Sequence, residues 1–569
     1  MLLSSWLKRI SDRIRSRRYQ PDRKPKKPDR FTQLGLTRLE DRVVLTASAV
    51  FSGFNDLLVV DVDQEDVTIS TNGGRITVTG SVTGALGAFT AVNVQQIIVN
   101  DTNAGVGSGA VDFTTSNGSD FVLFKGVFVS ADIETAVINT GITATSNGNT
   151  VDINAGTLQL NADVIANAGS ILLAGDVVLG EGQNVTLSTG ATTGQIQIDG
   201  SLNGTGGGAS EALVITAGTG DVVLNNVGMA GADDLESLTV TSADDVQIAG
   251  TVDLGSALSV TANSVTLGDD VATGSTIDVV AGNGAITVKG ALDTTTAGSD
   301  ITLTATSGLL LDGANADVAS GGGSFTVDAD SNGDNTGSYE QNDAGSTVSA
   351  GAGSVSITAA NATITGSISG TGALTFLPST VARSIGLGGG AGNFNLSDAE
   401  LLQLSDGFTG ITIGRADGTG AIVTDTANFT DPITLRGGAA TLGGLTTSQD
   451  NAATTVTTAT TTGVTVTGTL SANGSGAVDI NSGAGFLLSN GITLSSSTGA
   501  ISVDTTGANS LTVNGNVTTA GSGTVMLTGS GAVTMDDSSL IQADSTITVT
   551  AGAGDATIDV VTSTASTVT

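Results

Sequence analysis

The fold of this chain is constrained most by short alternating segments that recur about every twenty residues. Segments 237–240, 256–260, 275–279 and 299–303 start 19, 19 and 24 residues apart, and each alternates apolar with polar residues. Alternation over a few residues, ended by Gly, Asn or Asp, is typical of a short β-strand. A unit of this size cannot bury its own apolar face, so successive units must stack to form a continuous core.

The residue composition narrows the shape of that core. Residues 129–324 contain no Phe, Tyr, Trp, Pro or Arg, and Lys289 is their only Lys. A globular domain of this size normally fills its wide core with aromatic side chains. A solenoid needs only a thin stack of small branched side chains, so we predict an all-β fold, a right-handed parallel β-helix or β-solenoid. A string of β-sandwiches is the competing interpretation, but it would carry more aromatic residues and more Pro.

Two regions depart from the repeat pattern. Residues 51–128 hold seven of the 14 Phe, and residues 376–436 hold two Pro and three Arg. The second region also contains a short helical pattern in which Ser397 is a plausible N-cap and Glu400 completes a capping box. We therefore expect a basic leader at 1–45, a β-rich cap or small β domain at 46–130, solenoid coils at 131–375, an insertion or elaborated coil at 376–440, and solenoid coils at 441–569.

The charges are divided unevenly along the chain. Residues 1–43 hold 13 of the 19 Lys and Arg, whereas the remaining 526 residues hold six bases and 49 acids, a net charge of −43. Such a surface repels nucleic acid and anionic lipid. The chain has no Cys and no His, which excludes disulfides, Cys/His zinc sites and thiol or imidazole catalysis. No run of 18 apolar residues occurs, so no transmembrane helix is expected.

The leader has the pattern of a short basic helix. Leu3, Leu7, Ile10 and Ile14 recur at helical spacing among Lys and Arg, which predicts a basic amphipathic helix. A standard signal peptide needs an apolar run of roughly 7–15 residues, and residues 43–45 are too few for one. We therefore interpret residues 1–45 as an unconventional export segment, and a basic arm without an export role is the alternative.

Two segments carry a resemblance to known bacterial surface proteins. Leu39, Glu40, Arg42 and Leu45 form a segment that resembles the LE-x-R-x-LL motif of giant planctomycete surface proteins, with Val44 where a first Leu is usual. Residues 384–415 are similar to an element of large filamentous-haemagglutinin-like surface proteins. The resemblance implies a secreted or surface-attached bacterial protein with an extracellular or cell-surface location.

One segment has the spacing of a calcium loop. Asp328, Asp330, Asn332 and Asp334 place oxygen ligands at alternate positions, and Gly333 permits a sharp turn. The loop then departs from the pattern, because its twelfth position is Tyr339 and Glu340 comes one residue late. Calcium is the one cofactor that the sequence suggests, and a polar turn between two coils is the alternative.

These patterns favour a non-enzymatic surface protein with a structural or adhesin-like role. Its partners would be a cell-surface or extracellular-matrix component, a polysaccharide or other cells. The final coils look like interior ones, so we also expect end-to-end self-association or a longer chain. The alternative function is a β-helix polysaccharide lyase or glycoside hydrolase, which the shortage of bases and the lack of Trp in the body disfavour.

Binding to ice or another crystal surface through T-x-T segments is a third class of function. Segments 302–304, 457–462 and 465–467 supply the Thr residues. They do not recur at one coil position over many coils, so we attribute them to the β-propensity of Thr.

Overall fold

The computed structural model describes residues 47–53, 55–101, 109–205, 210–228, 235–564 and 568–569. The predicted leader helix and the export motif of Leu39, Glu40, Arg42 and Leu45 lie outside these residues and stay predictions. Residues Thr46–Thr569 form one compact unit. None of the helices in the described ranges has the length and hydropathy that a membrane-spanning helix requires.

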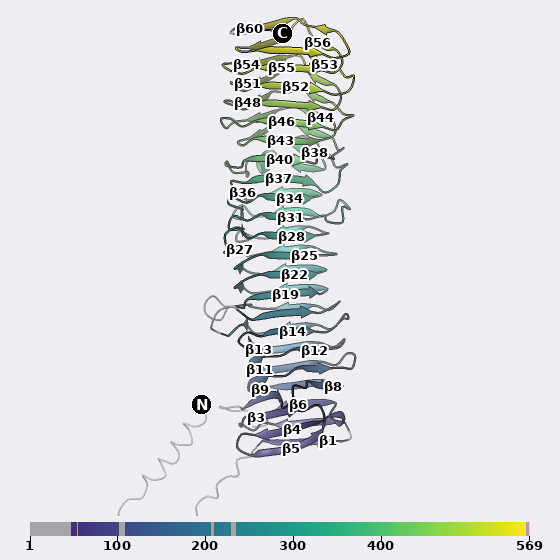
Figure 1. Ribbon diagram of the computed structural model, residues 1–569, viewed down its shortest axis with the longest axis vertical. Coiled ribbons are helices and arrows are strands. Elements are labelled where there is room, and N and C mark those ends of the chain that lie inside the picture. Colours follow the sequence, from purple (N-terminus) through teal and green to yellow (C-terminus); the bar gives the residue numbers. More distant parts are fainter. Residues whose placement is uncertain (1–46, 54, 102–108, 206–209, 229–234, 565–567) are drawn as a thin grey trace, which may run out of the picture. The chain divides into compact units, whose positions relative to one another are not determined.

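The compact unit is a parallel β-solenoid, as the repeat pattern predicted (Figure 1). Its most regular face, which we call the long ladder, is a stack of 19 parallel strands. At ~4.8 Å between neighbouring strands this stack extends about 90 Å. The strands are β8 (Phe121–Leu123), β10 (Ile142–Ala144), β12 (Val164–Ala166), β14 (Asn184–Ser188), β17 (Ala212–Thr216), β19 (Ser237–Ser242), β22 (Leu258–Ala262), β25 (Ile277–Ala281), β28 (Ile301–Ala305), β31 (Phe325–Asp328), β34 (Val355–Ala359), β37 (Ala373–Pro378), β40 (Gly410–Gly414), β43 (Ile433–Gly437), β46 (Thr454–Thr458), β49 (Val478–Ser482), β52 (Ile501–Thr505), β55 (Val525–Gly529) and β58 (Ile547–Ala551).

A second sheet combines the N-terminal cap with a neighbouring face of the first coils. In the cap, β1 pairs with β2, β3 with β4 and β4 with β5 in antiparallel fashion, whereas later neighbours are parallel. Its strands are β1 (Ser48–Ser52), β2 (Leu57–Asp61), β3 (Val67–Thr71), β4 (Arg75–Gly80), β5 (Gly84–Thr90), β6 (Gln96–Asn100), β7 (Ala110–Thr115), β9 (Gly126–Ile138), β11 (Val151–Leu160), β13 (Ile171–Leu179), β15 (Ile196–Ile198), β16 (Leu202–Asn203), β18 (Val222–Leu224), β20 (Asp245–Ile248), β23 (Ser264–Leu267), β26 (Ile286–Val288), β29 (Leu309–Leu311), β32 (Ser338–Gln341) and β35 (Asn361–Ile364). A 3₁₀ turn, η1 (Ala91–Asn93), follows β5.

Three shorter parallel sheets complete the coils. One closes the N-terminal coils and has six strands: β21 (Val252–Leu254), β24 (Val271–Thr273), β27 (Leu292–Thr294), β30 (Val318–Ala319), β33 (Thr347–Ser349) and β36 (Ser367–Ser369). The other two belong to the C-terminal coils and consist of β38 (Ile385–Leu387), β39 (Phe394–Leu396), β41 (Ile422–Thr424), β44 (Ala440–Leu442), β47 (Val464–Val466), β50 (Phe486–Leu488), β53 (Leu511–Val513), β56 (Val533–Met535) and β59 (Ala556–Thr557), and of β42 (Ala427–Phe429), β45 (Leu445–Thr447), β48 (Leu470–Ala472), β51 (Thr493–Ser496), β54 (Asn516–Thr519), β57 (Leu540–Ala543) and β60 (Val560–Ser563).

The sheets of the N-terminal coils give way to the two sheets of the C-terminal coils within segment 376–440. There the chain inserts β39 beside β38 and a one-turn helix, α2 (Asp398–Leu401), between two rungs of the long ladder. Ser397 caps this helix, and both hydrogen bonds of the capping box with Glu400 are present. The predicted capping box is therefore confirmed.

The core is a single column of small apolar side chains. Along each strand, buried residues alternate with outward ones, as in β28, where Ile301 and Leu303 are buried and Thr302 and Thr304 are half-buried. Buried Val, Ile, Leu and Ala residues form one continuous cluster from Ala47 to Ile547. The predicted narrow core is present, because each coil contributes only a few branched side chains to it.

Buried hydroxyl groups close many corners of the coils. At the end of a strand, a buried Thr or Ser takes an inward position and donates its hydroxyl to a main-chain carbonyl oxygen three to five residues further along the chain. This gives the carbonyl oxygen of the turn a hydrogen-bond donor; the carbonyl oxygens of Gly485 and Asn509 also accept a main-chain N–H, from Val464 and Gly531. The donors and acceptors are Thr189 to Gly194 (2.9 Å), Thr294 to Ser299 (3.2 Å), Thr447 to Ala452 (2.8 Å), Thr458 to Thr462 (2.8 Å), Ser482 to Gly485 (2.9 Å) and Thr505 to Asn509 (3.1 Å).

Removing one such hydroxyl should destabilise the solenoid. Thr189→Val keeps the volume but leaves the carbonyl of Gly194 buried without this donor, so the free energy of unfolding should fall by about 1–3 kcal/mol. The matched control is Thr186→Val, because Thr186 lies outward on β14 in the same coil; it should change stability by less than about 0.5 kcal/mol. Urea denaturation followed by circular dichroism measures both. Equal effects of the two substitutions would contradict the role of the corner hydroxyl.

The one aromatic hydroxyl in the described core should be dispensable. Tyr339 is fully buried on β32, burial raises its pKa, and its Oη has no hydrogen-bond partner among the described residues. Tyr339→Phe removes this unpaired group and keeps the ring, so stability should be unchanged or higher. Tyr339→Ala should instead cost about 3–5 kcal/mol, because it leaves a cavity. A clear loss of stability in Tyr339→Phe, measured by the same denaturation, would contradict this expectation.

Candidate functional site

The predicted calcium loop connects β31 to β32 and is organised by Asp330. This residue is only 2 % exposed. Its carboxylate accepts the main-chain N–H of Asn335 at 3.0 Å and the hydroxyl of Ser379 at 2.5 Å. The carboxylate of Asp330 thus joins the loop to the turn that follows β37, two coils further along the solenoid.

The other three predicted ligands serve local turns. Asp328 accepts the N–H of Asp330 at 3.3 Å, Asn332 accepts the N–H of Asp334 at 3.1 Å, and Asp334 accepts the hydroxyl of Thr336 at 2.6 Å. The hydrogen bonds from Thr336 lower the pKa of Asp334. Burial raises the pKa of Asp328, and the negative charge of Asp330 adds to that effect.

The loop carboxylates do not gather into an ion-binding group. Within the ranges that the structure describes, no three Asp or Glu side chains are arranged to hold a metal ion. The loop oxygens accept N–H and hydroxyl donors of the protein instead. Calcium binding at Asp328, Asp330, Asn332 and Asp334 therefore stays a prediction.

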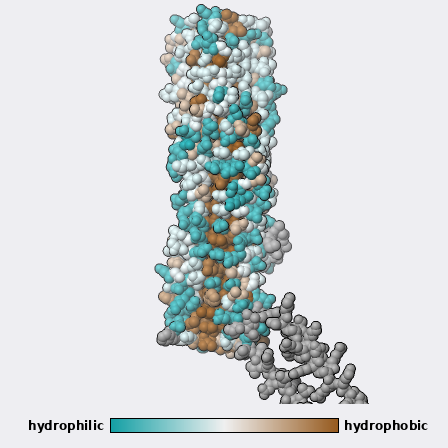
Figure 2. All heavy atoms as spheres, turned by 180° about the vertical axis from the view of Figure 1, so that it is seen from behind, coloured by the Kyte–Doolittle hydropathy of each residue, from teal (hydrophilic) through white to brown (hydrophobic). Residues whose placement is uncertain are grey.

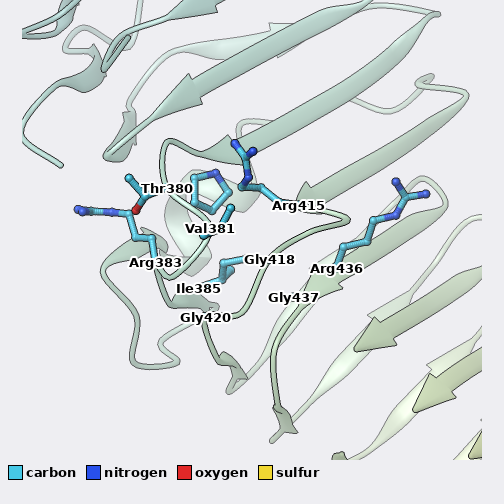
Figure 3. Close-up of a pocket in the computed structure, with 10 residues that line it drawn as sticks. Thr380, Val381, Arg383, Ile385, Arg415, Gly418, Gly420, Arg436 and Gly437 are labelled. Atoms are coloured by element: carbon cyan, nitrogen blue, oxygen red, sulfur yellow. The ribbon is translucent and has the colours of Figure 1, made fainter. Parts of the chain in front are cut away.

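The same region brings together half of the basic residues of the body. Arg383 lies between β37 and β38, Arg415 follows β40 directly, and Arg436 lies on β43. The three lie around one corner, which we call the arginine corner (Figure 3). The hollow between them has no room for a water molecule. In Figure 3 the three guanidinium groups point in different directions, and Arg383 points away from the other two.

Each arginine has different partners. Arg383 donates to Asn335 Oδ1 at 3.0 Å and to the carbonyl oxygen of Asn393 at 3.2 Å, and burial lowers its pKa while the charge of Asp330 opposes that shift. Arg415 forms the only ion pair among the described residues, with Asp417 at 2.9 Å, and this contact lowers the pKa of Asp417. The exposed guanidinium group of Arg436 makes no ion pair or hydrogen bond with any described residue.

Glycines allow the rungs of this corner to approach closely. Gly414 has a φ of +101°, and a Cβ there would lie 1.9 Å from the carbonyl oxygen of Arg436. A Cβ at Gly420 would lie 2.0 Å from the carbonyl oxygen of Arg383. In the sequence these residues are only three scattered Arg, and nothing in their spacing shows that they lie around one corner of neighbouring coils.

A column of hydroxyl side chains runs along the long ladder next to the arginine corner. Strand register aligns its members, which we call the hydroxyl column: Thr302, Thr326, Ser356, Thr375, Thr412, Thr434 and Thr455. A column of single hydroxyl residues is a different feature from a recurring T-x-T pattern, and the sequence did not reveal it. The members lie 24, 30, 19, 37, 22 and 21 residues apart, so no fixed period reveals them.

The T-x-T pattern itself is not sustained. Two residues further along each strand, the outward positions are Thr304, Asp328, Thr358, Leu377, Gly414, Arg436 and Thr457. A flat surface of paired threonines is thus interrupted in the middle of the column. The T-x-T segments therefore do not recur at one coil position over many coils, as the sequence indicated, and this disfavours binding to a crystal surface.

Two larger hollows lie elsewhere on the solenoid. A groove of about 450 Å³ is lined by Asn226, Thr251, Asp253 and Asp270, and none of the described residues that line it is Lys or Arg. Asp270 also accepts the N–H of Ala291 at 2.8 Å. A mostly apolar hollow of about 390 Å³ lies beside β8. Seen from behind, the surface is most apolar along the N-terminal half of the stack (Figure 2).

Comparison with protein-family models, curated proteins and solved structures finds no match for this chain. The fold by itself defines the class of protein. The chain is a β-solenoid repeat protein, with one basic corner on an otherwise acidic body.

Neutralising Asp328 should stabilise the calcium-free protein at neutral pH. Asp328→Asn keeps an acceptor for the N–H of Asp330 and removes a charge whose pKa is raised. A raised carboxyl pKa means that the charged form lowers folded stability above that pKa, so the difference should shrink as the pH falls through it towards the ordinary value. Thermal unfolding in a chelator, between neutral pH and the ordinary carboxyl range, measures this.

Calcium provides the second arm of that experiment. If the loop binds calcium, millimolar calcium should raise the unfolding temperature of the wild type and have less effect on Asp328→Asn. No shift in the wild type would leave the loop as a polar turn. A variant that is less stable than the wild type in chelator would contradict the unfavourable charge at Asp328.

Proposed function

We propose that this chain is a non-enzymatic, exported structural or adhesin-like rod that displays side chains at the surface of a bacterial cell. The observation that supports this proposal is the unbroken stack of coils that runs through the described body. A stack of this kind makes a long surface with repeated positions and no central cavity. Its parallel connections are expected to be right-handed.

The charge distribution supports the same function. The body carries 49 acids against six bases, which keeps a long repetitive surface soluble and limits non-specific association. The outward positions of the long ladder are mostly Thr, Ser, Asp and Asn, side chains that are compatible with water and with a hydrogen-bonding partner. Export rests on the resemblance of Leu39, Glu40, Arg42 and Leu45 to the surface-protein motif.

A β-helix polysaccharide lyase or hydrolase is the second candidate, and the groove with Asp253 and Asp270 favours it. Hydrolysis needs two carboxylates close to the sugar, and this groove supplies two. Lyase chemistry also needs a base next to the acids, and the described lining residues contain neither Arg nor Lys. The groove therefore offers part of the chemistry that an enzyme of this class requires.

Location and turnover test the proposed function together. Antibody should label intact producing cells as strongly as permeabilised ones, and the purified protein should leave a panel of polysaccharides uncleaved. Labelling that requires permeabilisation would exclude a surface role. Turnover that is lost in Asp253→Asn/Asp270→Asn, but kept in a matched Asp244→Asn/Asp245→Asn control, would establish the enzyme instead.

A further inference from the structure

One stretch of the long ladder combines outward positions that lack acids with the arginine corner, whereas the earlier acid-free rungs from β8 to β22 carry no outward Arg or Lys. The outward residues of β34, β37, β40, β43 and β46 include no acid, and we call these five rungs the acid-free window. Asp328 on β31 and Asp479 on β49 bound the window on its two sides. Five rungs extend about 20 Å along the ladder.

The arginine corner lies at the edge of this window. Arg436 and Thr434 are both outward residues of β43, so the guanidinium group lies beside the hydroxyl column on the same strand. Gly414 is the register partner of Arg436 on β40. Gly414 is buried against the carbonyl oxygen of Arg436, so the two rungs approach closely and no side chain of β40 stacks on the guanidinium group. Arg415 follows Gly414 directly and adds a second guanidinium group to this edge.

The positive charge of this corner is only partly balanced. Asp417 pairs with Arg415, whereas Arg383 is held by the uncharged oxygens of Asn335 and Asn393. Arg436 is exposed and makes no ion pair or hydrogen bond with a described residue. Elsewhere the body is strongly acidic. The turns of the same coils carry acids such as Asp406 and Asp425, so the attraction for an anionic group is local to the exposed guanidinium group of Arg436 and the outward positions beside it.

We propose that the acid-free window and the arginine corner bind an acidic polysaccharide. Guanidinium groups pair with carboxylate or sulfate groups through parallel hydrogen bonds, and Thr hydroxyls can both donate to and accept from sugar hydroxyls. Thr375, Thr412, Thr434 and Thr455 offer this pairing at a repeat of ~4.8 Å along the window. This inference rests on the proposed surface function and names the class of ligand for it.

The geometry favours an extended ligand over a compact anion. The three guanidinium groups point in different directions and enclose no space for a water molecule, so they cannot converge on one phosphate (Figure 3). Nucleic acid would need many more cations and aromatic side chains for base stacking. A folded protein partner would need apolar or aromatic anchors at the centre of the contact, where this window presents hydroxyl groups.

Binding of purified full-length protein to immobilised polysaccharides tests the proposal. The probes are polygalacturonate for carboxylates, dextran sulfate for sulfates and dextran as the neutral control. The wild type should bind at least one anionic probe and not dextran, and salt should weaken the binding. Arg415→Gln/Arg436→Gln should raise Kd by about tenfold or more, because both cations face the ligand.

Matched variants separate local contacts from total charge. Arg75→Gln/Lys289→Gln removes two cations elsewhere on the body and should change Kd by less than about twofold. Thr412→Val/Thr434→Val should weaken binding, whereas Thr302→Val/Thr326→Val, in the same column but outside the window, should not. Equal losses in the two charge variants, or no binding of either anionic probe by the wild type, would overturn the proposal.

Three further outcomes decide between the binding site and the surface function. Arginine-dependent self-association in sedimentation velocity, without any polysaccharide, would overturn the proposal by assigning the corner to a second copy of the chain. If the protein binds polysaccharide but the antibody labels only permeabilised cells, the site would be supported and the surface function rejected. Surface labelling without polysaccharide binding would reject the site and leave the surface function standing.

Discussion

Parallel backbone pairing between successive coils is the interaction on which the rest of this structure depends. Along the long ladder each strand pairs with the equivalent strand of the next coil, and from β22 to β58 the register has no irregularity. Equivalent positions therefore stack into columns. An inward column is apolar except where a buried Thr or Ser bonds to a main-chain carbonyl oxygen, as Ser482 and Thr505 do. An outward column becomes a continuous strip of surface.

Stacking also decides which side chains an outward column can hold. Like charges at ~4.8 Å repel each other, so long runs of one charge are unfavourable on such a strip. In the hydroxyl column the members are uncharged. At the arginine corner, Arg436 stacks between Gly414 and Thr457 rather than on another cation. The basic residues are thus staggered around the corner, and that stagger separates their guanidinium groups.

The repeated strands could be predicted from the sequence because they depend on local information. Alternation in segments such as 256–260 and 275–279 identified strands that the structure contains as β22 and β25. The capping box of Ser397 and Glu400 was predictable for the same reason. The residues of each pattern lie within a few positions of one another in the sequence. Neither prediction therefore required knowledge of which coils are neighbours.

The surfaces could not be predicted, since they depend on register across coils of unequal length. Thr375 and Thr412 are neighbours in the hydroxyl column although 37 residues separate them. Likewise Asp330 looked like a calcium ligand in its own loop, but it accepts a hydrogen bond from Ser379, 49 residues away. The hydroxyl of Ser379 thus occupies an oxygen of the Asp330 carboxylate that the local sequence pattern assigned to calcium.

Unequal coil length has a consequence for how such a protein can change over evolutionary time. Between neighbouring members of the hydroxyl column the chain is 19 to 37 residues long, yet each coil advances the stack by the same ~4.8 Å. Insertions at a corner therefore leave the flat face unaltered, and duplication of a whole coil lengthens the protein by one fixed step. The length of the solenoid and its ligand specificity can therefore diverge separately. The number of coils sets the length, and the side chains of a few rungs set the specificity.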